Sequence, residues 1–88
     1  MRHIRFTDHV RTKIAVLNAH GFPVTEDMVR LSLRSPDRVE PARGIRKLAQ
    51  KALDATHVLR VVYVEAGQDI LVITLYPGRR TRYEKDPV

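Results

Sequence analysis

Residues 58–76 read VLRVVYVEAGQDILVITLY, and this stretch decides the fold. Val58–Val64 and Ile70–Tyr76 are rich in β-branched side chains, and the segment Ala66–Asp69 between them carries the glycine of a turn. Two such runs around a glycine-containing turn predict an antiparallel hairpin. Pro77-Gly78 is expected to end its second strand, directly before a basic segment.

The segments before the hairpin give a less uniform prediction. Ile45–Asp54 favours a helix by residue propensity and shows only fair alternation of apolar and polar side chains. A lone hairpin would be marginal in water, which favours a further strand from this segment. A short extended piece is expected around Arg38–Glu40.

Two helices are predicted in the first half of the chain. Arg2–Phe6 alternates like a short strand, and Thr7 is suited to cap a helix over Asp8–His20. Thr25 is suited to cap a second helix, which Ser35-Pro36 ends because the residue before proline avoids helical geometry. The predicted order therefore begins with a strand and two helices.

Composition limits the classes of protein that the chain can belong to. Its 88 residues carry a net charge of +6 and no cysteine, which excludes disulfides, thiol nucleophiles and thiolate zinc sites. The length predicts one domain over residues 1–88. We expect it in the cytoplasm, because the sequence shows neither a signal peptide nor a membrane span. The pI of about 10.3 favours a polyanionic partner. We expect no cofactor and no metal, since no histidine pair has the spacing of a helical metal site.

Several segments resemble a family of small bacterial proteins of unknown function that are similar to RelE/ParE/BrnT-type toxins of toxin–antitoxin systems. The resemblance covers nearly the whole chain and is most specific in LAQKALDATHVLRVVYVE (48–65) and VITLYPGRRTRY (72–83). Phe6-Thr7-Asp8-His9 and Ser35-Pro36-Asp37 fit the same pattern. It implies an α+β fold of RelE type, with two N-terminal helices packed on a small twisted antiparallel sheet in β-α-α-β-β-β order. Ile45–Asp54 would then be a strand.

The same resemblance implies an RNA-acting, metal-independent endoribonuclease or translation inhibitor. In such enzymes basic side chains hold the phosphates while the RNA 2′-hydroxyl attacks the neighbouring phosphorus. The candidate catalytic residues are Arg82, Tyr83, Arg60 and His9. Candidate nucleic-acid-binding residues are Lys47, Lys51, Arg79, Arg80 and Lys85. A complete catalytic set of the characterised toxins does not match residue by residue.

Local patterns add detail to these assignments. Polar and apolar residues mix on the strand face of Arg60, so we expect its side chain on a solvent-exposed concave surface. His57, in the segment Asp54-Ala-Thr-His, is interpreted as a residue that orients a turn. The dense basic segment Arg79–Lys85 is suited to phosphate contacts and base stacking, or to contact with an acidic partner protein.

Alternative functions remain open from the sequence. The chain also suits a non-catalytic module that binds nucleic acid or protein, including a ParE-like inhibitor of an enzyme such as gyrase. The possible partners are RNA, the ribosome and an antitoxin protein. We expect no interaction with a membrane. Unpaired strand edges in so small a sheet also favour a homodimer.

Overall fold

One sheet organises the computed structural model, which describes residues 3–84. Its strands are β1 (His3–Phe6), β2 (Arg38–Pro41), β3 (Lys47–Ala52), β4 (His57–Ala66) and β5 (Asp69–Arg79). Their spatial order is β1-β5-β4-β3-β2, with β1 parallel to β5 and every other pair antiparallel. The described chain is therefore an α+β domain with a mixed sheet.

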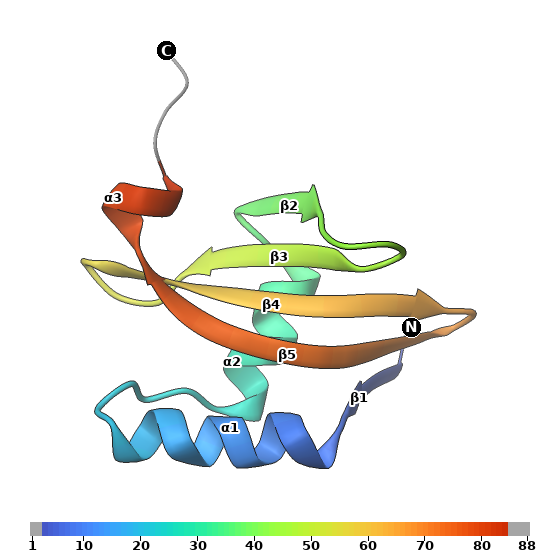
Figure 1. Ribbon diagram of the computed structural model, residues 1–88, viewed down its shortest axis with the longest axis horizontal. Helices are drawn as coiled ribbons and strands as arrows, with labels where there is room; N and C mark the ends of the chain where they lie inside the picture. The colour runs from blue at the N-terminus through green and yellow to red at the C-terminus, as the bar shows by residue number, and fades with distance from the viewer. Residues whose placement is uncertain (1–2, 85–88) are drawn as a thin grey trace.

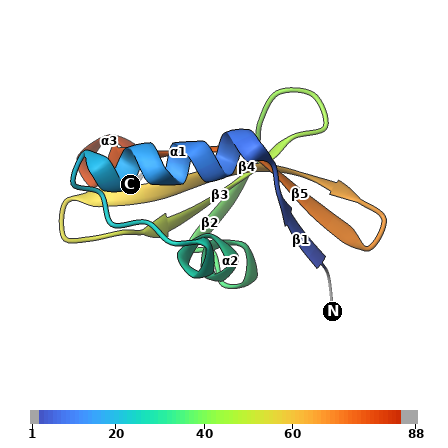
Figure 2. The same cartoon turned by 90° about the horizontal axis from the view of Figure 1, so that it is seen from below.

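Three helices accompany the sheet: α1 (Asp8–Ala19), α2 (Glu26–Arg34) and the single turn α3 (Arg80–Tyr83). α1 runs alongside β5, and α2 crosses behind β3 and β4 (Figure 1). The view from below separates the two longer helices (Figure 2), and Figure 1 shows α3 at the end of β5. No helix within residues 3–84 is long and apolar enough to cross a membrane.

Capping side chains define where the two longer helices begin. Thr7 accepts a hydrogen bond from the Val10 amide, and Thr25 accepts one from the Met28 amide. Each bond satisfies an amide that the first helical turn leaves without a partner. Gly21 follows α1 with a φ of 87°, a left-handed conformation that costs glycine little. These features confirm the predicted starts of both helices.

The main core lies between the helices and the inner face of the sheet. Its buried members come from both helices, the loop between them and the two central strands: Val10, Leu17, Val24, Val29, Leu59, Val61, Val72 and Leu75. Each buried aliphatic side chain of this size stabilises the fold by about 1.5–3 kcal/mol. The outer face of the sheet carries Arg60, and Tyr83 of α3 lies over it.

Three expectations about the strands need correction. Arg38–Pro41 forms a strand of its own, so the observed order is β-α-α-β-β-β-β rather than β-α-α-β-β-β. The sheet is mixed rather than antiparallel, because Ile4 of β1 pairs in parallel with Ile70 of β5. β5 continues through Pro77 and Gly78 to Arg79. Proline is tolerated there because, in the described chain, β1 pairs only with residues up to Val72, so the outer edge needs no donor from Pro77.

Ile45–Asp54 contains a strand despite its helical propensity, as the resemblance implies. Residues 47–52 pair with β4 along their whole length, and residues 47–50 also pair with β2. Leu48, Ala49 and Gln50 are buried. Pairing on both edges and burial on both faces outweigh a preference of a few tenths of a kcal/mol per residue.

Candidate functional site

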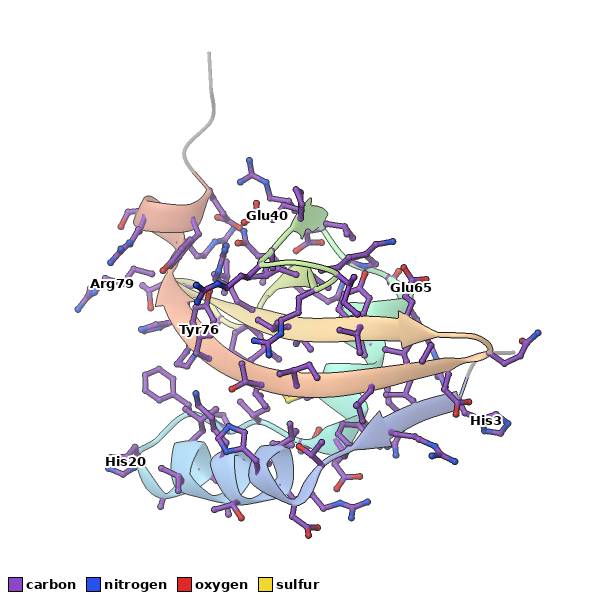
Figure 3. All side chains as sticks on the ribbon, turned by 45° about the vertical axis from the view of Figure 1, so that its right-hand side comes forward. His3, His20, Glu40, Glu65, Tyr76 and Arg79 are labelled. Carbon is purple, nitrogen blue, oxygen red and sulfur yellow. The ribbon has the colours of Figure 1, made fainter. Side chains whose placement is uncertain are left out.

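A surface pocket of about 420 Å³ opens at the end of β5, where α3 begins. Its lining combines a histidine, two arginines and a tyrosine with apolar and glycine positions: Phe22, His57, Pro77, Gly78, Arg79, Arg82 and Tyr83. Concave sites of this size with a few convergent polar groups are typical of ligand-binding sites. Figure 3 shows Arg79 at the end of β5, beyond Tyr76.

Gly78 allows the pocket wall to form. A Cβ atom added at this position would collide with the ring of Tyr83. The missing side chain therefore leaves the space in which the ring lies. Arg80 fixes the start of the turn, since its amide donates to the Thr56 carbonyl at 2.9 Å and its Nε donates to Glu84 at 2.6 Å. The hydrogen bond to Glu84 raises the pKa of Arg80.

Asp54 lies in the loop between β3 and β4 and orients His57, the first residue of β4. Asp54 Oδ1 accepts hydrogen bonds from the amides of Thr56 and His57 at 2.8 and 2.7 Å. The Thr56 amide is the main cause that lowers the pKa of Asp54, so this carboxyl group is ionised at neutral pH. Oδ1 also lies 3.1 Å from His57 Nδ1. Thr56 Oγ1 is the nearer neighbour of Nδ1, at 2.8 Å, and a hydroxyl group can donate or accept. When Nδ1 donates to the carboxylate, which can only accept, Nε2 of the neutral ring is an acceptor.

The His57 ring is held on its other side by an aromatic contact. Phe22, which follows α1, packs against it in a T-shaped arrangement with the ring centres 5.1 Å apart. No hydrogen bond to Nε2 occurs among residues 3–84. His57 is thus a half-buried histidine with one nitrogen fixed by a carboxylate and the other available to a ligand. The prediction that it orients the turn is consistent with its contact to Asp54, but its place in the pocket was not foreseen.

Arg60 lies beneath Tyr83 on the outer face of the sheet. Only 7% of its side chain is exposed, so the expectation of a solvent-exposed guanidinium is wrong. Its Nε donates to Tyr76 Oη at 3.1 Å and its Nη2 to Glu40 Oε1 at 2.8 Å. Nη1 donates to Gln50 Oε1. We call Arg60, Tyr76, Gln50 and Glu40 the Arg60 network. Figure 3 labels two of its members, Tyr76 on β5 and Glu40 on β2.

The Arg60 network explains how a charge can be buried here. Gln50 and Tyr76 lie directly opposite Arg60 on the neighbouring strands. Burial lowers the pKa of Arg60, but the hydrogen bonds to Tyr76 and Glu40 outweigh this effect and hold the pKa above its ordinary value. Hydrogen-bonded partners make an otherwise costly buried charge tolerable. Arg60 is therefore engaged within the fold and supports Tyr83 from below.

The C-terminal turn is fastened to this network by its backbone as well as by its ring. Arg38 Nη1 donates to the Tyr83 carbonyl at 2.9 Å, and Gln50 Nε2 lies 3.4 Å from the same oxygen. Arg82 lies above the Tyr83 ring, with its guanidinium carbon 5.4 Å from the ring centre. Arg79 and Arg82 are exposed. Two exposed guanidinium groups thus line the same pocket as a tyrosine whose position is fixed.

The remaining predicted residues lie elsewhere. Lys47 forms an ion pair with Glu65, and Lys51 donates to the Ser35 carbonyl at 2.7 Å. Neither lysine lines the pocket. His9 lies on α1, where its Nε2 is 3.4 Å from Thr74 Oγ1. Lys85 falls outside the described residues.

A larger hollow, of about 520 Å³, lies beside the loop between β2 and β3. Its described lining combines apolar and glycine positions with three charged side chains and contains neither histidine nor tyrosine: Val39, Glu40, Pro41, Gly44, Ile45, Arg46 and Lys47. We therefore regard the pocket at His57 as the candidate site. Across residues 3–84, no three histidine, aspartate or glutamate side chains are grouped so that they could hold a metal ion.

Comparison with known protein families, curated proteins and solved structures finds no match for this chain. The functional interpretation therefore depends on the geometry of the site.

Proposed function

We propose that the pocket binds single-stranded RNA and cleaves it without a metal ion. The observation that carries this proposal is the convergence of His57, Arg79, Arg82 and Tyr83 on one pocket, with His57 oriented by ionised Asp54. A histidine, two cations and an aromatic ring are the groups that such a reaction needs. The chain's net charge of +6 favours encounter with RNA.

Each group has a defined role in the proposed reaction. His57 Nε2 accepts the proton of the RNA 2′-hydroxyl as its oxygen attacks the adjacent phosphorus. The bond from phosphorus to the 5′-oxygen of the next nucleotide breaks, and that oxygen takes a proton from water or from protonated His57. The products are a 2′,3′-cyclic phosphate and a 5′-hydroxyl end. Arg79 and Arg82 stabilise the charge that develops on the phosphorus oxygens, and Tyr83 stacks on a base.

Arg60 takes a positioning role in this proposal rather than a catalytic one. Its donors are directed to Tyr76, Gln50 and Glu40, and its flat guanidinium lies 4.0 Å from the centre of the Tyr83 ring. Binding a substrate phosphate through Arg60 would require these contacts to break. Its contribution is to hold Tyr83 at the pocket wall.

A non-catalytic RNA-binding module is the second candidate, and one observation favours it. The one arginine that the described sheet buries is engaged internally, and the two arginines that line the pocket are exposed. Exposed guanidinium groups are sufficient for phosphate binding but stabilise a transition state less than buried ones. In this case RNA would bind and remain intact.

The sequence resemblance to toxin–antitoxin proteins supports a proposal for the larger biological role. We propose a toxin-like activity in which cleavage of messenger RNA, free or on the ribosome, blocks translation, and in which an antitoxin protein covers the basic segment. Added to a cell-free translation reaction, the purified chain should then stop protein synthesis and leave cut messenger RNA.

The cleavage proposal is tested with end-labelled single-stranded RNA in the presence of EDTA. We expect fragments that end in a 2′,3′-cyclic phosphate, and no cleavage of DNA of the same sequence, which lacks the 2′-hydroxyl. His57→Ala should lower the cleavage rate by about 10²–10⁴-fold, the usual contribution of a general base. His20→Ala is the matched control, because His20 is exposed at the end of α1 and outside the pocket. Bound but intact RNA would favour the second candidate, and equal losses in both variants would refute the role of His57.

A further inference from the structure

A second group of polar side chains lies between α1 and β5, away from the pocket. Lys13 Nζ and His9 Nε2 are each 3.4 Å from Thr74 Oγ1. A hollow of about 280 Å³ lies beside them, lined by His9, Thr12, Lys13 and Val16. We infer that Lys13, His9 and Thr74 form a second phosphate subsite, which binds another phosphate of the RNA strand that occupies the pocket. This inference rests on the proposed function.

The local geometry leaves these three groups available to a ligand. Hydrogen bonds from nitrogen to oxygen are usually 2.7–3.2 Å long, so contacts of 3.4 Å hold their partners weakly. No acidic side chain pairs with Lys13 in the described part of the chain. An ammonium group, an imidazole and a hydroxyl group can each donate to a phosphate oxygen. Lys13 and His9 both approach Thr74 Oγ1, so the three groups lie close enough to contact a single phosphate group.

An irregularity in β5 contributes to the position of Thr74. Thr74 lies opposite Val62, whereas Val72 lies opposite Tyr63, so Ile73 is an extra residue in the strand. Such a bulge redirects the side chains next to it. Thr74 here faces the first turns of α1, where His9 and Lys13 are four residues apart and share one face of the helix.

The subsite and the pocket lie along the same helix–strand seam. Thr74 and Gly78 have the same orientation on β5 and are separated by four residues, or about 13 Å of extended strand. At its other end α1 leads to Phe22, which lines the pocket. A strand of RNA that passes from the pocket along this seam would therefore reach Lys13 after a few nucleotides. The substrate class that fits is a single-stranded RNA longer than a dinucleotide.

Binding of uncleavable RNA tests the subsite separately from cleavage. We would measure the affinity of 2′-O-methyl oligonucleotides of two to twelve nucleotides over a range of salt concentrations. Lys13→Ala should weaken binding of the longer oligonucleotides by about 3- to 10-fold and reduce the slope of log affinity against log salt by about one, as the loss of one phosphate contact does. Dinucleotide binding should not change.

Arg11→Ala is the matched control, since it removes one positive charge from the same helix at a residue that does not line the hollow. Thr74→Val preserves the shape of the side chain and removes its hydroxyl group. Like Lys13→Ala, it should weaken the binding of long oligonucleotides. Equal effects of Lys13→Ala and Arg11→Ala, or equal effects on short and long oligonucleotides, would overturn the subsite. If the parent chain binds the oligonucleotides but does not cut normal RNA, the cleavage proposal is refuted. The binding data for the variants then still decide whether the subsite exists. If no oligonucleotide binds, both are refuted.

Discussion

The guanidinium carbon of Arg60 lies 4.0 Å from the centre of the Tyr83 ring. This contact joins the middle of the sheet to the last described turn of the chain. Because Arg60 also donates to side chains on β2, β3 and β5, the position of the pocket wall depends on four strands at once. The stability of the fold and the shape of the candidate site are therefore coupled through one buried cation.

Arg60→Ala should destabilise the protein by about 2–3 kcal/mol, because it removes three hydrogen bonds and takes the guanidinium donors away from Gln50 Oε1 and Glu40 Oε1. Urea unfolding measures this difference. Arg5→Ala is the control, since the Arg5 side chain is 71% exposed in its ion pair with Asp69 and such pairs contribute less than about 1 kcal/mol. Equal losses in the two variants would contradict a structural role for the Arg60 network.

Gly78→Ala should move Tyr83 and α3 away from the sheet, because the new methyl group takes the space of the ring. We expect a loss of about 1–3 kcal/mol, as in other overpacked sites. The measurement is a double-mutant cycle with Tyr83→Ala. In the Tyr83→Ala background the added methyl group meets no ring, so Gly78→Ala should cost much less there. Additive effects would show that the two residues do not interact.

Asp54→Asn should lower the rate of the proposed cleavage by about 10- to 100-fold, which is the loss expected for a hydrogen bond to a charged acceptor. The amide can present its oxygen or its nitrogen to His57, so it no longer determines which ring nitrogen carries the proton. Single-turnover cleavage measures the effect. The affinity for 2′-O-methyl RNA should stay constant, because Asp54 does not line the pocket. A fall in affinity without a change in rate would assign Asp54 a binding role instead.

Asp54 should also make stability depend on acid pH. Its pKa in the fold is below the ordinary value of 3.8, mainly because the Thr56 amide donates to the ionised form. A group with a lowered pKa stabilises the fold fully above the unfolded value, and this contribution disappears as pH falls through the folded value. The difference in unfolding free energy between the parent chain and Asp54→Asn should therefore shrink below about pH 4. A difference that is constant between pH 6 and pH 3 would contradict this linkage.

The sequence predicts the hairpin and the helix starts because these depend on local patterns. The hairpin follows from Val58–Val64 and Ile70–Tyr76, and the helices follow from Thr7 and Thr25 as caps. The parallel pairing of β1 with β5 cannot be predicted from local patterns. It joins two segments far apart in the sequence and depends on the path of the chain after α1 and α2. For β2 the sequence predicts only a short extended piece, since four residues ending in proline give a weak signal.

The site was predictable in part for the same reason. The sequence singles out Arg79, Arg82 and Tyr83, which line one pocket in the structure, because a basic segment follows a buried strand. The burial of Arg60 was missed because it requires Glu40, whose place opposite Leu48 is fixed by the register of β2. The Asp54-Ala-Thr-His57 spacing was the available signal for the aspartate–histidine pair, since an aspartate in such a turn accepts from amides two and three residues later. Only the three-dimensional structure places that pair beside Arg82.

Arg82 and Arg80 have the same charge in the same helical turn, but the structure gives them different roles. Arg82 is exposed and lines the pocket, whereas Arg80 binds Glu84 and donates to the Asp54 carbonyl at 3.3 Å. Arg82→Ala should thus reduce RNA affinity by about tenfold and leave the urea midpoint unchanged, as expected for a residue that contacts phosphate. Arg80→Ala should lower the urea midpoint, because α3 loses a contact with the β3–β4 loop. If both variants lose RNA affinity equally and neither changes stability, binding depends on overall charge rather than on the pocket, and the proposed site is wrong.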